Sequence, residues 1–178
     1  EFISCGRLDD LQCVFASLSG FLAGTAGIGQ ATTASEKTER HRSRTHMPVL
    51  CVLDNEEVGS ETKQGAASTF LYDTLTRIHS SLGYTQEDYL IHLADSFMIS
   101  ADNAHAVHPN HPDKADLSNR PYLNGGIVLK FNGNQKYCTD GISAAMFRDI
   151  CKQAGVPVQT FTNRSDMTGG STLGNISN

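Results

Sequence analysis

Acidic side chains stand at three widely separated points of this 178-residue chain. They are Asp9 with Asp10, the run Asp54-Asn55-Glu56-Glu57, and Asp102. The second and third groups directly follow short apolar runs that are typical of buried strands. Ligands of open α/β sheets bind at the carboxyl ends of strands, so these acids can converge in one crevice. Because convergent carboxylates repel one another and a divalent cation is the most direct counter-charge, the pattern favours a metal site.

Each acidic group taken alone has a simpler explanation. Asp9 can cap a helix, and Glu56 with Glu57 can belong to a solvated loop. The third group carries more information, because His105 and His108 follow Asp102 directly beyond an expected strand. Carboxylates and imidazoles gathered in this way are suited to a metal or substrate site.

Alternating strands and helices are expected to position these side chains. Apolar residues from Leu8 to Leu22 recur at three- and four-residue steps and predict a helix packed against a core. The other expected helices span 64–82, a short stretch after Thr85, and 142–154. The expected strands are Val49–Leu53, Phe97–Ser100, Gly126–Phe131 and Val156–Thr162. This alternation predicts an α/β fold with a mostly parallel central sheet.

The segment 24–47 lacks apolar periodicity and ends in a cluster of basic residues and histidines. It is longer than an ordinary connection of about 2–6 residues in α/β units. We therefore expect a flexible insertion loop at the surface.

Composition excludes several classes of protein. Lys and Arg number 14 against 19 Asp and Glu, which gives a net charge of −5 and argues against nucleic acid as a partner. No apolar run reaches the roughly 20 residues that cross a bilayer, and the N-terminus lacks a signal-sequence pattern. The five cysteines are scattered without a CxxC pair. We expect a soluble cytoplasmic protein with no membrane or nucleic-acid partner.

Several ordered motifs closely resemble those of the aspartyl aminopeptidase family of dinuclear metallopeptidases, and the likeness covers nearly the whole chain outside 24–47. The motifs are Arg7-Leu8-Asp9-Asp10, Asp54-Asn55-Glu56-Glu57-Val58-Gly59-Ser60, Ser100-Ala101-Asp102-Asn103-Ala104-His105-Ala106-Val107-His108-Pro109-Asn110, Asn124-Gly125-Gly126 and Arg164-Ser165-Asp166-Met167. The resemblance implies that residues 1–178 form part of a metallopeptidase catalytic domain. The implied fold is an incomplete three-layer α/β/α sandwich of the zinc-exopeptidase kind.

The resemblance also implies two divalent ions, zinc by preference, held by carboxylates. Asp9 is expected to bridge both ions, with Asp102 on one ion and Glu57 on the other. Glu56 is then the expected general base, which takes a proton from water and passes it to the leaving amine.

Three further side chains receive roles from the same resemblance. His108 is the better candidate to donate to the developing oxyanion, and His105 is a candidate substrate-binding or supporting residue. A purely structural role for His105 stays open. Lys130 matches a position associated with binding the acidic N-terminal residue of a peptide, although a solvent-facing Lys is an equally simple explanation.

The family's histidine ligands lie in an HxD motif upstream of the bridging aspartate and in a late C-terminal segment, and neither segment is present in this stretch. Two hypotheses therefore stay open. The first is part of an aminopeptidase that acts on peptides as a homo-oligomer when full length, with a carboxypeptidase or deacylase as the runner-up. The second is a catalytically silent fragment, because carboxylates without imidazoles give poor zinc geometry.

Overall fold

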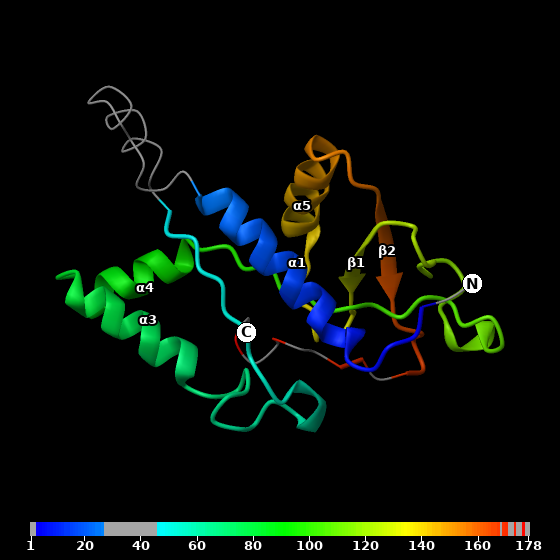
Figure 1. Ribbon diagram of the computed structural model, residues 1–178, viewed down its shortest axis with the longest axis horizontal. Helices are drawn as coiled ribbons and strands as arrows, with labels where there is room; N and C mark the ends of the chain where they lie inside the picture. Colours follow the sequence, from blue (N-terminus) through cyan, green and yellow to red (C-terminus); the bar gives the residue numbers. More distant parts are fainter. Residues whose placement is uncertain (1–2, 27–45, 168, 171–172, 174–175, 177–178) are drawn as a thin grey trace. The chain divides into compact units, whose positions relative to one another are not determined.

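The computed structural model describes residues 3–26, 46–167, 169–170, 173 and 176. The chain divides into two compact units: Glu1–Leu53 with Ala101–Asn103, and Asp54–Ser100 with Ala104–Asn178. The elements, shown in Figure 1, are α1 (Leu8–Thr25), the 3-10 turn η1 (Glu56–Val58), α3 (Phe70–Ser81), α4 (Gln86–Ala94), the 3-10 turn η2 (Pro112–Lys114), β1 (Ile127–Phe131), α5 (Gly141–Gln153) and β2 (Val158–Thr162).

Helix α1 forms where the apolar repeat predicts it, within the first unit. Asp9 and Asp10 have non-helical φ and ψ angles, so the regular helix begins after them. At the other end the Thr25 hydroxyl donates to the Phe21 carbonyl at 2.7 Å. The helix therefore extends into the segment 24–47 that we expected to be a loop, and residues 27–45 of that segment lie outside the described residues.

The prediction that α1 packs against a core is not met among the described residues of the first unit. The helix has no buried residue, and Phe15 at the middle of its apolar stripe is 73% exposed. The apolar stripe marks the face expected to pack, and the other described residues of the first unit do not bury it.

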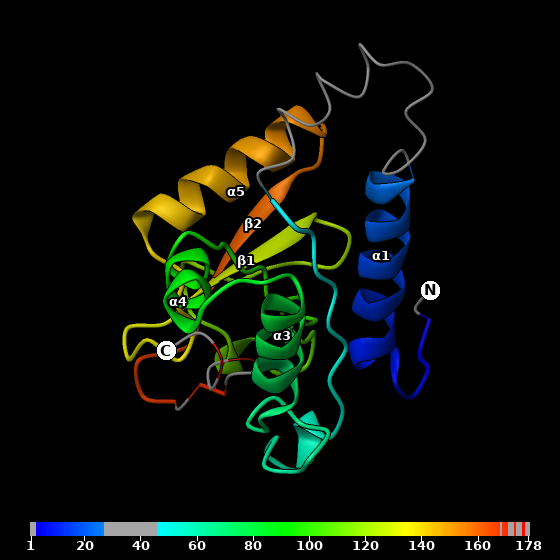
Figure 2. The same ribbon diagram turned by 90° about the vertical axis from the view of Figure 1, so that its left-hand side faces the viewer.

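The second unit contains a two-stranded parallel sheet with α5 in the connection. Strand β1 pairs with β2 from Ile127 opposite Val158 to Phe131 opposite Thr162. Figures 1 and 2 show α5 lying alongside the two strands, and Arg148 of α5 donates to the Thr160 hydroxyl of β2 at 2.7 Å. This is a βαβ unit, as the alternation of patterns predicts.

Local sequence explains where α5 begins and ends. Asp140 and Ser143 form a capping box, in which the Asp140 carboxylate accepts from the Ser143 backbone N–H and the Ser143 hydroxyl accepts from that of Asp140. The helix ends before Gly155, whose φ of +68° favours glycine. Ala144 and Cys151 are its buried residues.

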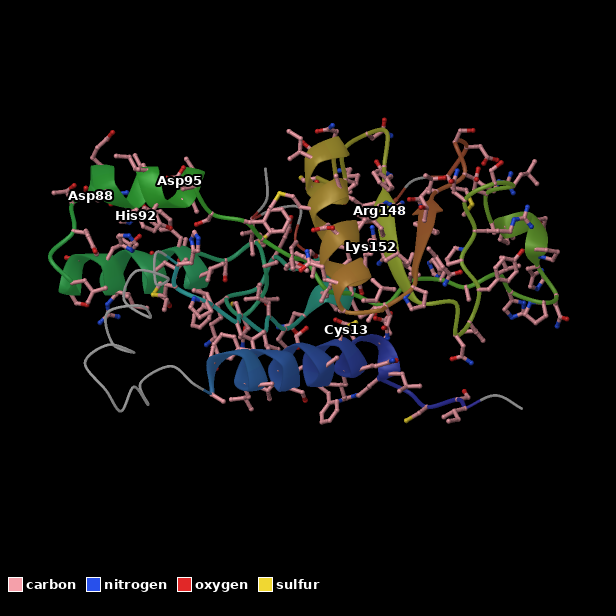
Figure 3. The ribbon with its side chains drawn as sticks, turned by 90° about the horizontal axis from the view of Figure 1, so that it is seen from above. Cys13, Asp88, His92, Asp95, Arg148 and Lys152 are labelled. Atoms are coloured by element: carbon pink, nitrogen blue, oxygen red, sulfur yellow. The ribbon has the colours of Figure 1, made fainter. Side chains whose placement is uncertain are left out.

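Helices α3 and α4 form a hairpin in the same unit (Figure 1). Thr85 caps α4 in a second capping box with Asp88, and Gly83, with φ of +85°, supplies the turn. Tyr89 is 5% exposed and meets the Tyr72 ring edge to face at 5.7 Å. Figure 3 shows Asp88 and His92 on α4, and His92 Nδ1 lies 2.7 Å from His79 Nε2.

Two of the four expected strands do not form. Val49–Leu53 and Phe97–Ser100 are described, and neither run is paired in a sheet. Apolar branched residues fit a sheet, but a strand also needs a hydrogen-bonded neighbour, which the described residues do not supply for either run. The expected helix over 64–82 is shorter than predicted, because turns occupy the residues before Phe70.

The fold class is α/β with a parallel sheet, as the sequence predicts, and within the described residues the sheet has two strands. No helix in that part of the chain combines the length and apolar character needed to cross a membrane.

Replacing Gly126 by Ala should destabilise the sheet. Gly126 has φ of +106°, and an added Cβ would lie 2.2 Å from the Pro157 carbonyl oxygen, which accepts from Ile127 N. We expect the free energy of unfolding to fall by about 1–3 kcal/mol, measured by urea denaturation. Gly141→Ala is the matched control, because its Cβ meets nothing within 4 Å. Equal stabilities of the two variants would contradict the prediction.

Acid should loosen the start of α5. Hydrogen bonds from the Ser143 side chain and backbone hold the pKa of Asp140 below its ordinary value of 3.8. Folding therefore favours the ionised carboxylate of Asp140. Its contribution to the free energy of unfolding is complete above the ordinary pKa of 3.8 and is lost as the pH falls through the lower pKa of the folded state. Between pH 5 and pH 2, the wild type should lose more unfolding free energy than Asp140→Asn. Parallel stability curves for the two proteins would refute this.

Candidate metal site

Three carboxylates gather at the start of α1 in the first unit. Asp9, Asp10 and Asp102 each offer an oxygen, and these oxygens all lie within 4.8 Å of one another. Asp9 is exposed, whereas Asp10 and Asp102 are half-buried. The structure thus brings Asp9 and Asp102 together from distant parts of the chain and adds Asp10, whose role the sequence did not predict.

Asn103 connects the two chain segments that form this cluster. Its backbone N–H donates to Asp10 Oδ1 at 3.3 Å, and its side-chain Nδ2 donates to the Leu8 carbonyl at 2.9 Å. The Cys13 thiol of α1 donates to Asn103 Oδ1 at 3.2 Å. The sequence did not single out Asn103 as a functional residue, although it stands next to Asp102 in a motif that resembles the family.

The donor set of the cluster fits a divalent cation. Oxygen ligands bind zinc at about 2.0–2.2 Å in tetrahedral geometry, so two oxygens on one zinc ion lie about 3.5 Å apart. The three oxygens lie within 4.8 Å of one another, so shifts of about an ångström would bring them to that spacing. Asp9, Asp10 and Asp102 are therefore the described residues of this unit that could hold a metal.

Glu56 and Glu57 lie in the second unit, in the turn η1. Asn55 and Gly59 flank the turn, both in the left-handed region, with φ of 61° and 97°. A 3-10 turn has three residues per turn, so consecutive side chains point about 120° apart. Both glutamates are exposed. This geometry allows one carboxylate to bind an ion while its neighbour faces a different group.

The loop around η1 is closed by a tight backbone approach. Ser60, which is 5% exposed, donates its N–H to the Asn55 carbonyl and accepts from Ala67 N. A Cβ on Gly65 would lie 2.1 Å from the Ser60 carbonyl oxygen, so only glycine fits there. Asp54 N also donates to the Gln64 carbonyl at 3.0 Å. The two ends of the loop are therefore fixed to each other, which positions the glutamates between them.

His105 and His108 are exposed residues of the second unit. His108 Nδ1 accepts from Asn110 N at 3.2 Å, so the neutral ring carries its proton on Nε2. The His108 ring also lies 5.2 Å from that of His111. This bond leaves Nε2 of His108 as the nitrogen available to donate, and an N–H donor is what an oxyanion needs.

Lys130 occupies β1 opposite Phe161 of β2 and is half-buried. Its ammonium lies 5.8 Å from the centre of the Tyr137 ring, within the range of a cation–π interaction. The side chain is therefore partly covered by its neighbours, and both explanations that the sequence offered for it stay open. The backbone of strand β1 and the neighbouring Tyr137 ring restrict the positions that the Lys130 ammonium can adopt.

A parallel α/β unit and a carboxylate cluster able to hold a cation are features of α/β metalloproteins, and the comparisons with known proteins identify which family is present. Residues 1–178 match the family described as aminopeptidase I zinc metalloprotease (M18). The chain is 47% identical over 176 residues to a probable M18 family aminopeptidase 2 of Clostridium acetobutylicum, covering 99% of this chain and 37% of that protein. It is 39% identical over 176 residues to a probable aspartyl aminopeptidase of Ricinus communis, covering 99% of this chain and 34% of that protein.

Solved structures agree with the family match. A cryo-EM structure of the Ape4 and Nbr1 complex superposes with a TM-score of 0.70 at 35% identity, covering 94% of this chain and 30% of that one. An S. cerevisiae mApe1 dodecamer shares the fold, with a TM-score of 0.60 at 24% identity over 88% of this chain and 33% of that one. The chain belongs to the M18 family of zinc metalloproteases, and it spans about a third of the length of the curated relatives it matches.

Proposed function

We propose that residues 1–178 form part of the catalytic domain of a metal-dependent aminopeptidase, which hydrolyses peptides at an N-terminal acidic residue. The observation that carries this proposal is the cluster of Asp9, Asp10 and Asp102 in a chain of a zinc metalloprotease family. The relatives are named as aminopeptidases, and one of them as an aspartyl aminopeptidase.

Two zinc ions are the proposed cofactors. Asp9 would bridge them, with Asp102 on one ion and Glu57 on the other. When bound, such ions polarise the scissile carbonyl and acidify a water molecule. The close spacing of the Asp9 and Asp102 oxygens supports the shared site, and the family description names zinc.

Glu56 is the proposed general base. Its position beside Glu57 in η1 lets two adjacent carboxylates take different roles, one binding an ion and the other moving a proton. Glu56 would accept the proton of the attacking water and deliver it to the amine that leaves. The close approach of Ser60 and Gly65 supports this role because it restricts the backbone of the loop that carries Glu56.

His108 and His105 are proposed to act on the substrate. The Nε2–H of His108 would donate to the oxyanion that develops on the scissile carbonyl, and its Nδ1 bond to Asn110 keeps the ring in that tautomer. His105 is exposed three positions earlier, and we assign it to substrate binding.

Lys130 is the proposed partner of the substrate's acidic side chain. An ammonium near a carboxylate forms a charge-assisted hydrogen bond, which favours acidic over neutral N-terminal residues. Its half-buried position over Tyr137 supports this role, because a charge with restricted motion loses less entropy on binding.

The complete protein is proposed to be a homo-oligomer in the cytoplasm. One structural neighbour is a dodecamer. Cys5, Cys51 and Cys151 are free thiols, as is usual in a reducing compartment, and burial raises the pKa of the Cys51 thiol. Size-exclusion chromatography with light scattering would test the assembly, and a monomer at micromolar concentration would contradict it.

The function is tested with the complete protein and a series of peptides. We expect hydrolysis of peptides that begin with Asp or Glu, loss of activity after chelation, and recovery when zinc is added. N-terminal acetylation of the same peptides should abolish turnover, because an aminopeptidase requires a free amine. Cleavage of the acetylated peptides at their C-terminus would favour the carboxypeptidase alternative. If the zinc-loaded protein hydrolyses none of the peptides, the result would favour a catalytically silent protein.

A further inference from the structure

Asn103 fastens the two chain segments of the carboxylate cluster to each other at the residues that flank Asp9. Its side-chain Nδ2 donates to the carbonyl of Leu8, the residue before Asp9. Its backbone N–H donates to the carboxylate of Asp10, the residue after Asp9. Asn103 itself is covalently next to Asp102. These two bonds therefore hold the Asp102 backbone against the Asp9 backbone, although the segments are more than 90 residues apart in sequence.

Cys13 completes the orientation of the Asn103 amide. The Leu8 carbonyl can only accept, so the amide nitrogen must face it and Oδ1 must face the other way. The Cys13 thiol donates to that Oδ1 at 3.2 Å. Cys13 lies on α1, in the regular helical part that follows Asp9 and Asp10 (Figure 3). Both ends of the amide are thus tied to the same helix.

The energetic need for such a tie follows from the charges. Three carboxylates within 4.8 Å repel one another before any cation is bound, and this repulsion pushes Asp102 away from Asp9 and Asp10. Asn103 is neutral, so its bonds oppose the separation without adding charge. Holding the ligands in place before the ion arrives lowers the cost of binding.

We propose that Asn103 is a positioning residue that keeps Asp102 beside Asp9 for a divalent ion, and that Cys13 orients its amide. This inference rests on the proposed function, because it assigns a support to the same metal site. Residues that support metal ligands in this way contribute about 10- to 100-fold to metal affinity.

The test measures zinc affinity of the complete protein by competition with a chromophoric chelator. Asn103→Ala removes the side-chain bonds to Leu8 and Cys13 without changing the charge, and we expect about 10- to 100-fold weaker zinc binding. Asn134→Ala is the matched control, because Asn134 is an exposed asparagine in the loop after β1. The visible spectrum of the cobalt-substituted protein should change in Asn103→Ala and stay unchanged in Asn134→Ala.

A pair of Cys13 variants separates positioning from a general loss of folding. Cys13→Ala removes the donor to Oδ1 and should weaken zinc binding by about 2- to 10-fold, whereas the hydroxyl of Cys13→Ser should restore most of the affinity. If circular dichroism shows that Asn103→Ala is unfolded, the comparison of the two Cys13 variants still tests whether the orientation of the Asn103 amide affects zinc binding.

The outcomes distinguish this inference from the proposed function. Wild-type protein that binds zinc and hydrolyses peptides, with wild-type affinity in Asn103→Ala, overturns the positioning role alone. Equal affinities of Cys13→Ala and Cys13→Ser overturn the role of Cys13. Wild-type protein that binds no zinc overturns both the inference and the proposed function.

Discussion

Replacing Glu56 by Gln is expected to lower kcat by about 10²- to 10⁴-fold while zinc binding stays at the wild-type level. Gln keeps the size and hydrogen-bonding shape of the side chain but cannot accept a proton at neutral pH. Because Glu56 is exposed in η1, the change should leave stability unaltered. The measurement is kcat and KM on a peptide with an N-terminal Asp, together with the zinc content of the purified variant.

Two matched substitutions show whether the effect belongs to Glu56. Glu61→Gln changes an exposed glutamate of the same loop and should leave kcat within about twofold. Glu57→Gln should reduce zinc content, because that carboxylate is the proposed ligand. A Glu56→Gln variant with wild-type kcat would show that another group takes the proton.

Replacing Gly65 by Ala is expected to damage both stability and activity. The new Cβ would lie 2.1 Å from the Ser60 carbonyl oxygen and 2.6 Å from its carbonyl carbon, and these backbone atoms can move only if the loop opens. We expect the free energy of unfolding to fall by about 1–3 kcal/mol. We also expect kcat/KM to fall by about 10²-fold, because the loop carries Glu56 and Glu57 and a shift of about 1 Å in reacting groups can have this effect.

A second glycine supplies the control for this experiment. Gly133→Ala adds the same methyl group where nothing lies within 4 Å, so its stability and activity should match the wild type. Urea denaturation and peptide kinetics on the two variants complete the comparison. Wild-type kcat/KM in a folded Gly65→Ala protein would show that the loop closure does not position the glutamates.

Elements whose signals are local were predicted well. The helix after Thr85 and the helix expected over 142–154 both form, and each is set by residues close together in sequence: the Thr85 capping box for α4, and the apolar repeat and Gly155 for α5. The branched runs that became β1 and β2 also formed as predicted, because the helix between them brings the second strand back beside the first. Local propensity and tertiary contacts agree in this part of the chain.

Elements whose signals depend on distant partners were predicted less well. Val49–Leu53 and Phe97–Ser100 have strand-like composition, yet neither is paired among the described residues. The same limit applies to the apolar face of α1, which has no buried residue. The composition of a segment indicates which kind of element it can pack against or pair with. It does not show whether the rest of the chain brings such an element next to it.

The sequence by itself determined the α/β class, the positions of most helices, the family and the acidic residues that are candidates for metal binding. Only the tertiary structure decided that Asp102 meets Asp9, that Asp10 joins them, and that Asn103 and Cys13 hold the two segments together. The physical reason is the sequence separation of the interacting residues. Helix caps and apolar periodicity depend on residues about one helical turn apart. The carboxylate cluster depends on residues more than 90 positions apart, which interact only after folding brings them within hydrogen-bonding distance.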